Sequence, residues 1–371
     1  MNRNSTSRLI TIFTPSCADE GDTNAQNLTV KELVARWPAD QFHITMIRQG
    51  TPDPRIGARP NVRLVQWTNR GNSLRLLRHC LFSRPDIYFF PRCGPLDRAF
   101  FDLRRRFHLR TALISYIVMM INDSSRGGLI GRVILEADLV CANSSYVAET
   151  VRREFGRDPM VMHDGVDKRF FFPRQARDKA GPLVVLYGGS FQPRKRVEAV
   201  IAQAACWPAV SFRLAGKGET EADCRQLCRE LGCNNVEFLG HLTSAQLGNE
   251  MRKADVFLFP SILEGHPQVL IQAAACGLPS IAMNIYRPDS VKDGETGFLV
   301  QSDEELSQRL DLLLTNREVR CKMAEAAVQL AKRFDWDSIA AKWAELFRQV
   351  AASRGKLRTA ESMASEGAHA N

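Results

Sequence analysis

The chain alternates short apolar runs with amphipathic stretches, and the alternation occurs in two series separated by one break. Short apolar runs bounded by turn residues are typical of strands buried on both faces, and helical stretches between them indicate a parallel sheet covered on both sides. In the first series we predict strands at residues 9–14, 42–47, 62–67, 86–90, 111–118 and 138–142, and helices at 25–37 and 145–155. This alternation predicts the α/β class.

A segment rich in charge, proline and glycine interrupts the pattern at residues 168–182, and we interpret it as an interdomain linker. The alternation then resumes, with strands at 183–187, 210–215, 236–239, 256–260 and 279–283, and helices at 195–206, 219–231, 243–252, 267–276 and 303–314. A chain of 371 residues suits two domains better than one core. We therefore predict an N-terminal domain at 1–167, a C-terminal domain at 183–334, a terminal helix at 335–354 and a disordered tail at 355–371.

Composition is typical of a soluble globular protein, because 44% of the residues are hydrophobic and 25% are charged. No run approaches the roughly 18 apolar residues of a membrane-spanning helix, and we interpret the first apolar stretch as a strand rather than a signal peptide. We therefore predict a cytoplasmic protein. The closest cysteine grouping, Cys224, Cys228 and Cys233 with His241, does not have the spacing of a zinc site, so we predict no metal.

The net charge of +9 is concentrated in one basic segment, which runs from Arg70 to Arg110. It contains ten arginines and three aspartates, which gives a local net charge of +7. Three interpretations stay open: a solvated surface, attraction to an anionic membrane, and attraction to phosphate-bearing substrates. Nucleic acid is less favoured, because no nucleic-acid-binding module accompanies the charge.

The segment at residues 259–279 carries the strongest chemical signal. In open parallel sheets ligands bind beyond the carboxyl ends of the strands, and here a buried strand is followed by Glu264, Gly265 and a helix that we predict to start at Pro267. The free N–H groups and dipole of that helix start would hold a diphosphate. Glu264 can accept hydrogen bonds from sugar hydroxyls, and Gln272 could bind a ribose diol. The alternative is an ordinary strand–loop–helix with a solvated glutamate.

A second signal follows the first strand of the second series, where Gly189 opens a glycine-rich turn that ends near Lys195. A lysine at a helix start beside such a turn is a reasonable phosphate contact, with a solvated helix end as the alternative. The turn at Gly216, after the next strand, is weak evidence by itself.

The segment at residues 259–279 resembles the hallmark of retaining glycosyltransferases of family 4. Their pattern is Pro-Ser-x-x-Glu-Gly-Phe-Gly, then a second Glu with seven residues between the two acids, then Ala-x-Ala-x-Gly-x-Pro. Glu264 matches the first acid, Gln272 occupies the second position, and His266 stands where Phe is usual. The resemblance extends over most of the chain. It implies the GT-B fold, in which two Rossmann-like α/β/α domains face a central cleft and a terminal helix crosses back to the first domain.

The resemblance also implies a donor site. Glu264 would be the catalytic residue, Lys195 matches the family's phosphate-binding Lys, and Ser190 occupies the position of its Arg, so Arg194 would supply the missing charge. The implied donor-binding residues are Gly189, Ser190, Arg194, Lys195, Gly265, His266, Pro267, Gln268, Val269 and Gln272, and those near the nucleotide base are Gly216, Gly240 and His241.

The acceptor side is less informative. Relatives carry a Gly-Gly turn after the first strand, where this chain has Gly21, Asp22 and Asn24. Many also have a His in the cleft after the strand that corresponds to residues 111–118; this chain has none there, and Asn122 or Asp123 would be the replacement. For a polar residue after a strand, a helix cap is the alternative role.

The implied reaction transfers a sugar from a nucleotide-diphosphate sugar to the hydroxyl of a carbohydrate or lipid-linked acceptor, with retention and without a metal or other cofactor. Such an enzyme would serve bacterial glycan, polysaccharide or glycolipid synthesis. We expect peripheral contact with the inner face of an anionic membrane through the basic segment, and no nucleic-acid partner. Two alternatives remain: a catalytically silent binding or partner subunit, and a nucleotide-sugar epimerase, for which we find no general base.

Overall fold

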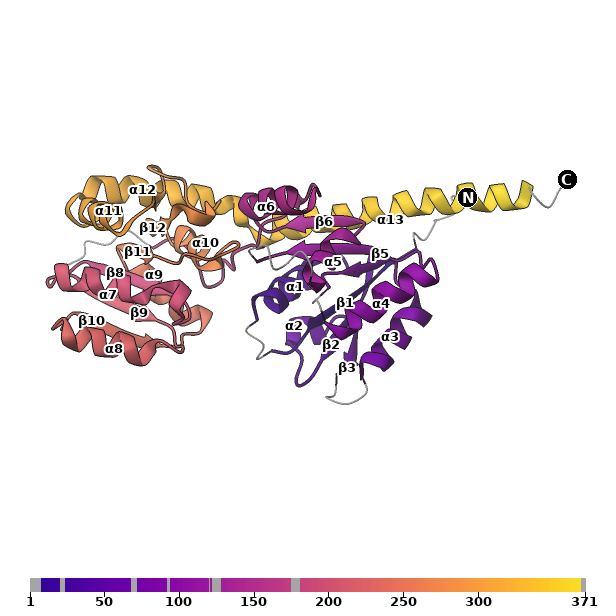
Figure 1. The fold of residues 1–371 in the computed structure, drawn as a ribbon, viewed down its shortest axis with the longest axis horizontal. Helices are drawn as coiled ribbons and strands as arrows, with labels where there is room; N and C mark the ends of the chain where they lie inside the picture. The colour runs from indigo at the N-terminus through magenta and orange to yellow at the C-terminus, as the bar shows by residue number, and fades with distance from the viewer. Residues whose placement is uncertain are drawn as a thin grey trace. The chain divides into compact units, whose positions relative to one another are not determined.

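The structure is a computed structural model that describes residues 8–20, 24–67, 72–91, 94–119, 121, 128–174 and 181–367. The chain divides into two compact units. The first comprises Met1–Asn143, Val147–Met162 and Asp337–Asn371, and the second comprises Ser144–Tyr146 and His163–Trp336. In each unit, helices cover both faces of a central sheet (Figure 1).

The first unit is built around a parallel sheet whose strands have the order β3-β2-β1-β4-β5-β6-β7 among the described residues. Its strands are β1 (Ile10–Cys17), β2 (Phe42–Arg48), β3 (Val62–Gln66), β4 (Ile87–Phe89), β5 (Ala112–Ile117), β6 (Leu139–Ala142) and β7 (Met160–Val161). Its helices are α1 (Ala25–Arg36), α2 (Pro54–Gly57), α3 (Asn72–Ser83), α4 (Pro95–Arg106), α5 (Leu129–Leu135) and α6 (Ser145–Phe155), the first two residues of which belong to the second unit.

The second unit repeats this plan with the strand order β10-β9-β8-β11-β12-β13. Its strands are β8 (Val184–Gly188), β9 (Ser211–Ala215), β10 (Val236–Gly240), β11 (Val256–Phe259), β12 (Ser280–Met283) and β13 (Gly297–Val300). Its α-helices are α7 (Val197–Cys206), α8 (Glu221–Glu230), α9 (Ser244–Lys253), α10 (Gln268–Ala275), α11 (Asp303–Thr315) and α12 (Arg317–Ala331), with 3-10 turns at Pro193–Lys195, Asn284–Tyr286 and Lys332–Phe334.

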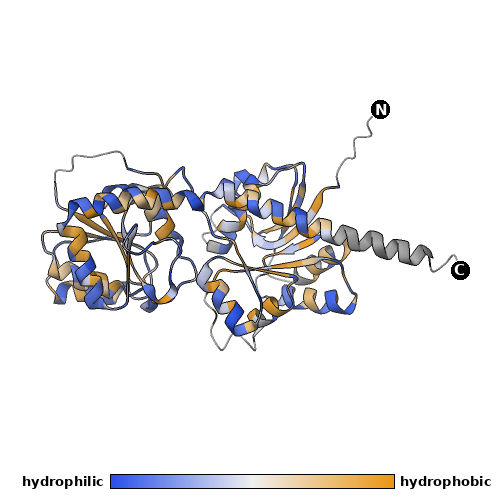
Figure 2. Ribbon diagram, turned by 90° about the horizontal axis from the view of Figure 1, so that it is seen from above, coloured by the Kyte–Doolittle hydropathy of each residue, from blue (hydrophilic) through white to orange (hydrophobic). Residues whose placement is uncertain are grey.

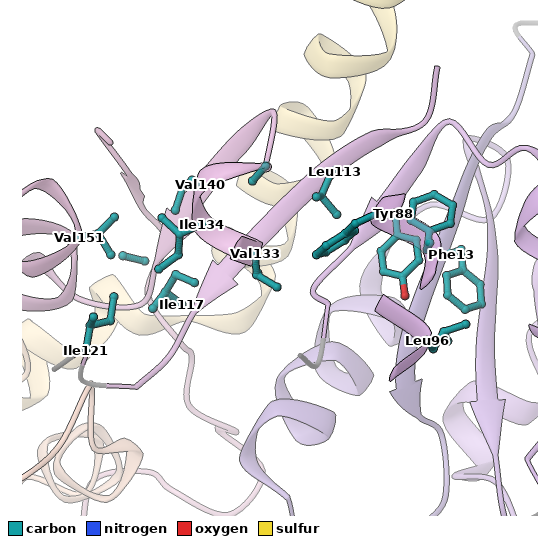
Figure 3. Close-up of a cluster of buried hydrophobic side chains, with 14 of the residues drawn as sticks. Phe13, Tyr88, Leu96, Leu113, Ile117, Ile121, Val133, Ile134, Val140 and Val151 are labelled. Atoms are coloured by element: carbon teal, nitrogen blue, oxygen red, sulfur yellow. The ribbon is translucent and has the colours of Figure 1, made fainter. Parts of the chain in front are cut away.

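Apolar strands lie at the centre of each unit and amphipathic helices lie outside them (Figure 2). Strand β11 shows the reason, since its four residues, Val-Phe-Leu-Phe, are all buried. In the first unit, Phe13, Tyr88 and Leu113 lie on neighbouring strands and pack into one cluster with residues of α4 and α5 (Figure 3). The predicted alternation of buried strands and covering helices is therefore confirmed.

Helix α13 (Trp336–Gly367) returns the chain from the second unit to the first. Trp343 is fully buried, and its ring centroid lies 4.9 Å from that of Phe89 and 5.2 Å from that of Tyr116. The indole N–H of Trp37 donates a 3.1 Å hydrogen bond to the carbonyl of Ala340. From Asp337 onward, the helix therefore completes the core of the first unit.

Two predicted boundaries differ from the structure. The beginning of the predicted linker is packed onto the second unit, where Phe171 is 2% exposed and Arg174 lies 3.5 Å from the carboxylate of Asp255. An aromatic side chain that can be buried makes this part of the segment structured in spite of its charge. The tail that we expected to be disordered continues as helix as far as Gly367. Residues 355–366 contain no proline or glycine after Gly355, so nothing in them interrupts a helix.

The described cysteines are all free thiols, and Cys80, Cys141 and Cys276 are buried as their apolar surroundings predicted. Burial raises the pKa of the Cys141 and Cys276 thiols to about 12. Within the described ranges, no helix is long and apolar enough to cross a membrane.

Candidate functional site

The second sheet reverses its strand order between β8 and β11, which pair directly although β9 and β10 lie between them in the chain. In open parallel sheets ligands bind beyond the carboxyl ends of the strands at such a switch point. The loop after β8 contains Ser190 to Lys195, and the loop after β11 contains Ser261 to Pro267. Most of the predicted donor-binding residues therefore come from two loops that begin side by side at one edge of this sheet.

Glu264 is the centre of a charged cluster between these two loops. Its Oε1 atom accepts hydrogen bonds from Nζ of Lys195 at 2.5 Å, from Nη1 of Arg194 at 2.9 Å and from Oγ of Ser261 at 2.5 Å. The side chains of Lys195 and Glu264 are each 11% exposed, whereas that of Arg194 is 38% exposed. Two cations against one carboxylate leave a net positive charge at the switch point.

Backbone hydrogen bonds join the two loops. The N–H of Ile262 donates to the carbonyl of Arg194 at 2.9 Å, and the hydroxyl oxygen of Ser261, whose proton is directed to Glu264, lies 3.2 Å from the same carbonyl. In return, Nη1 of Arg194 donates to the carbonyl of Leu263 at 2.8 Å. The charged cluster is therefore held by backbone atoms as well as by opposite charge.

We predicted that Lys195 begins a helix, and this prediction is wrong. It ends a 3-10 turn, and Arg196, which follows, has a left-handed backbone with φ of 52° before α7 begins. This turn directs the Lys195 side chain inward, where Nζ lies 5.0 Å from the ring centroid of Phe259. Burial lowers the pKa of Lys195, and the carboxylate of Glu264 opposes that shift by favouring the charged form.

Two buried tyrosines lie close to this cluster. The hydroxyl of Tyr187 donates to the carbonyl of Ser190 at 3.1 Å, which fixes the glycine-rich turn. The hydroxyl of Tyr286 is buried and has no hydrogen-bond partner among the described residues. Burial, and next the charge of Glu264, raise the pKa of Tyr286 well above its ordinary value, so its hydroxyl stays protonated as a donor. Since buried polar groups are nearly always partnered, this hydroxyl is a candidate contact for a ligand.

Helix α10 begins one residue later than predicted. Pro267 is its N-cap, with an extended backbone, and Gln268 is its first residue. The physical reason is that a preceding loop in extended conformation places the proline before the first turn rather than in it. A Cβ built on Gly188 would lie 3.3 Å from Cγ2 of Val269, so the helix start lies against the end of β8. Gln272 is half-buried one turn further along.

The glycine turns after β8, β9 and β10 approach one another closely. Gly216 has φ of 146°, and a Cβ there would lie 1.8 Å from the carbonyl oxygen of Gly189. The N–H of Gly216 bonds to the carbonyl of Gly240, which has φ of 68°. Only glycine fits the Gly216 position. His241, which follows Gly240, is exposed. The residues predicted near a nucleotide base therefore lie on adjacent strand ends.

A second cluster in this unit was missed by sequence reasoning. Oδ2 of Asp289 lies 3.1 Å from Nε2 of His163 and accepts a 2.7 Å hydrogen bond from the N–H of Ser145. The ring of His266 lies 5.4 Å from that of His163, and the hydroxyl of Ser144 donates to the carbonyl of Gly265 at 3.0 Å. Four separate segments thus meet at the donor loop. Little in the sequence signalled it, because His163 follows the short strand β7, which we did not predict.

The ionisable groups of this cluster are strongly shifted. Burial, and next the neighbouring His163, lower the pKa of His266 to about 3. Its ring is 5% exposed, and neither of its nitrogens has a partner among the described residues. Burial would raise the pKa of Asp289, but hydrogen bonds from His163 and from the N–H of Ser145 lower it to about 2. Asp289 is therefore ionised and His266 neutral near pH 7.

The predicted acceptor-side residues are only partly described. Gly21, Asp22, Asn122 and Asp123 lie outside the described residues. The side chain of Asn24 accepts hydrogen bonds from the N–H groups of Gln26 at 3.0 Å and of Asn27, as the N-cap of α1. Its alternative role as a helix cap is therefore observed. In the part of the chain that the structure describes, no group of three His, Cys, Asp or Glu side chains could hold a metal ion.

Residues 168–330 match the family model described as glycosyl transferases group 1. The match covers less than half of the chain, and we call the matched segment the group 1 domain. The chain is also 27% identical over 256 residues to the D-inositol 3-phosphate glycosyltransferase of Streptomyces bingchenggensis. That similarity covers 62% of this chain and 56% of the relative, so the chain spans little more than half of that protein's length.

Solved structures share the fold over nearly the whole chain. Sucrose-phosphate synthase from Thermosynechococcus elongatus superposes with a TM-score of 0.76 at 20% identity, covering 93% of this chain and all of that one. The Anabaena protein HepE, in complex with UDP and glucose, superposes with a TM-score of 0.73 at 18% identity and covers 92% of this chain. The predicted GT-B fold is confirmed, and the group 1 domain forms its second unit.

Proposed function

We propose that this protein is a glycosyltransferase that moves a sugar from a nucleotide-diphosphate sugar to an acceptor hydroxyl. The observation that carries the proposal is the cluster of Arg194, Lys195 and Glu264 at the switch point of the group 1 domain. It combines cations for a diphosphate with a carboxylate for sugar hydroxyls at the sheet edge where ligands bind.

The diphosphate would bind to Lys195 and Arg194, which outnumber the negative charge of Glu264 by one. The first turn of α10, with the N–H groups of Gln268 and Val269, lies against the end of β8 and adds the positive end of a helix dipole. The diphosphate gains negative charge as the glycosidic bond breaks. Cations already held in place would stabilise that charge without reorganising.

The sugar and nucleoside would occupy either side of the diphosphate. Glu264 would accept hydrogen bonds from sugar hydroxyls, and the buried hydroxyl of Tyr286 supplies a donor beside it. Gln272 would bind the ribose, and the turns at Gly216 and Gly240 would contact the base. HepE, which has this fold, is solved with UDP and glucose, which supports a nucleoside diphosphate as the leaving group.

For the reaction itself we propose transfer with retention, because the loop after β11 resembles that of retaining enzymes. The bond from the anomeric carbon to the diphosphate oxygen breaks, and the acceptor oxygen forms a new bond on the same face. The acceptor proton passes to the departing phosphate oxygen. No metal ion or other cofactor enters this scheme, because the cations of Arg194 and Lys195 neutralise the leaving group.

The acceptor would be a carbohydrate or a lipid-linked sugar, and the pathway bacterial glycan, polysaccharide or glycolipid synthesis. Peripheral contact with an anionic membrane would come from the basic segment, whose helices expose Leu74 and Phe82 at 73% and 77%. Arg78 lies 5.4 Å above the ring of Phe82, the mixture of charge and apolar surface that suits a lipid interface. Free thiols throughout the described cysteines fit the reducing cytoplasm, where we place the protein.

A panel of nucleotide sugars, assayed for nucleotide release with and without acceptors, tests the transfer. We expect Glu264→Ala to lower turnover more than about 100-fold, as removal of a catalytic group does. Lys195→Ala should weaken UDP binding about tenfold or more in calorimetry, since a hydrogen bond between charged groups is lost. The matched controls are Glu295→Ala and Lys292→Ala, which remove an exposed ion pair of the same unit.

The outcomes separate the alternatives. Saturable UDP binding without turnover on any donor would favour a catalytically silent subunit, for which the replacements at Ser190 and Gln272 are the supporting observations. Conversion of the donor sugar to its epimer without an acceptor would favour the epimerase. Absence of nucleotide binding, or equal effects of the site variants and the controls, would contradict the proposed site.

Membrane contact is tested with vesicles. We expect the protein to bind vesicles that contain anionic lipid at low salt, and the binding to fade as salt shortens the Debye length to about 3 Å near 1 M. Phe82→Ala should weaken it further by removing exposed apolar surface. Equal binding to neutral vesicles would contradict an electrostatic contact.

A further inference from the structure

A cavity of about 870 Å³ lies in the first unit, at the edge of the sheet opposite to the strand ends where ligands usually bind. Its floor is formed where neighbouring strands begin: Ile10 starts β1, Asp86 precedes β4 and Thr111 precedes β5. Arg348 and the alanines after it on α13 form one wall. The volume is in the range of small-molecule sites.

Positive charge dominates the lining. Four arginines line the cavity together with one histidine and a single carboxylate, that of Asp86; the arginines are Arg8, Arg84, Arg110 and Arg348, and the histidine is His108. The four arginines and the one carboxylate give the lining a net charge of +3. Such a cavity would repel cations and attract an anion.

Two of these arginines are held in place by other residues. Nη2 of Arg8 lies 3.0 Å from Oδ1 of Asp86. Oδ2 of Asp86 accepts hydrogen bonds from the N–H of Thr11 at 2.9 Å and from its hydroxyl at 2.8 Å. Nη1 of Arg348 donates to Oε1 of Gln41 at 2.7 Å, and its Nη2 bonds to Glu345. These contacts place the Arg8 and Arg348 side chains at the cavity, where they are 62% and 43% exposed and accessible to a ligand.

Two further residues of the lining have a left-handed backbone conformation. Arg84 follows α3 with φ of 44°, and His108 follows α4 with φ of 46°. Glycine takes this left-handed position at a helix end at the least cost, so both positions carry backbone strain. The side chain of Arg84 makes no hydrogen bond or ion pair among the described residues.

Apolar side chains complete the lining. Phe107 and Leu9 are 59% and 39% exposed at the cavity, and Leu109 and the alanines of α13 lie beside them. The volume far exceeds that of an inorganic phosphate. The residues therefore suit a ligand that joins an anionic group to an apolar part.

We propose that this cavity is a second binding site, for a phosphate monoester that carries an apolar group. The arginine fork matches the oxygens of phosphate, and Phe107 and Leu9 cover the apolar part. The source of the ligand is either a lipid headgroup or a soluble phosphorylated molecule. This site lies in the first unit and does not depend on the transfer reaction proposed for the second.

The test measures binding of dihexanoyl phosphatidic acid, a soluble short-chain probe, to the full chain by calorimetry. We expect saturable binding that Arg84→Glu weakens about tenfold or more, because a charge-assisted contact is replaced by repulsion. Arg105→Glu is the matched control: it makes the same charge change on the exposed surface of α4, outside the cavity. It should change the affinity less than about threefold, since exposed charges are screened.

A second variant guards against a folding defect. Arg84→Gly relieves the left-handed backbone, so we expect it to raise the thermal midpoint while still weakening the probe. Binding to anionic vesicles then identifies the source of the ligand. If Arg84→Glu weakens vesicle binding more than Arg105→Glu does, the ligand is a lipid headgroup. If both variants weaken vesicle binding equally while the wild type still binds the short-chain probe, the ligand is a soluble molecule. Failure of the probe to bind, or equal weakening by Arg84→Glu and Arg105→Glu, would overturn the proposal.

Discussion

At the scale of single residues, His266 shows how tertiary surroundings change the meaning of a motif. The sequence places it where the resembled family has Phe, and the structure buries its ring against His163 and Phe334. Its nitrogens have no partner among the described residues, so the ring behaves as an apolar group that can still titrate. The imidazole therefore adds a pH dependence that Phe would not.

We predict that His266→Phe removes part of the acid sensitivity of folding. The pKa of His266 is about 3 in the folded protein and about 6.5 when unfolded, so between these values the unfolded state takes up the proton. Stability is thus fully present above about pH 6.5 and is lost as pH falls toward 3. At pH 5 protonation of this residue in the unfolded state should lower the free energy of unfolding of the wild type by up to about 2 kcal/mol. The variant should not show this loss.

Urea denaturation of the second unit at pH 7.5 and pH 5 measures this difference. At pH 7.5 we expect the variant to be as stable as the wild type or more so, because it no longer buries unpartnered nitrogens. An equal loss of stability in both proteins between the two pH values would show that His266 is not buried in its neutral form.

At the scale of elements, the glycine turns depend on close approach of one backbone to another. Gly216 has φ of 146° and lies where any Cβ would meet the carbonyl oxygen of Gly189. Gly232, which follows α8, also has a positive φ, of 66°, but has open space around it. The first position combines steric overlap with backbone strain, and the second has strain alone.

We predict that Gly216→Ala destabilises the second unit more than Gly232→Ala does. The control should cost about 1 kcal/mol for its left-handed backbone. Gly216→Ala should cost at least about 2 kcal/mol more, because the turn after β9 must move away from that after β8. Urea midpoints measure the difference, and UDP affinity should fall only for Gly216→Ala. Equal midpoints for the two variants would contradict the close approach.

At the scale of the whole molecule, the chain leaves the first unit and returns to it through α13. Trp343 anchors α13 to the first unit, since its side chain is fully buried among Phe89, Tyr116 and Phe347. The first unit therefore requires residues from both ends of the chain for its core.

We predict that Trp343→Ala destabilises the first unit and leaves the second intact. Loss of a large buried aromatic side chain costs about 3–5 kcal/mol. Lys342→Ala, its exposed neighbour on the same helix, should change stability by less than about 0.5 kcal/mol. Thermal unfolding followed by limited proteolysis assigns the loss to a unit. If Trp343→Ala weakened UDP binding as much as Lys195→Ala does, α13 would have a role in the site as well.

The sequence by itself determined the local structure of this protein. Buried strands, covering helices such as that predicted at 243–252, and the position of Glu264 after β11 all depend on residues close in the chain, and all are observed. Helices α2, α3, α4, α5 and α12, strands β7 and β13 and the exact start of α10 were not predicted. For the two strands the reason is that short segments carry little periodicity.

Only the tertiary structure decided which distant residues meet. Strand order brings the loop of Lys195 beside that of Glu264, 69 residues away. Two loops bring Asp289 to His163 across 126 residues, and α13 completes a core that includes Trp37. The physical reason is that such pairs arise when whole elements bury their apolar faces together, and no local pattern specifies that partner choice.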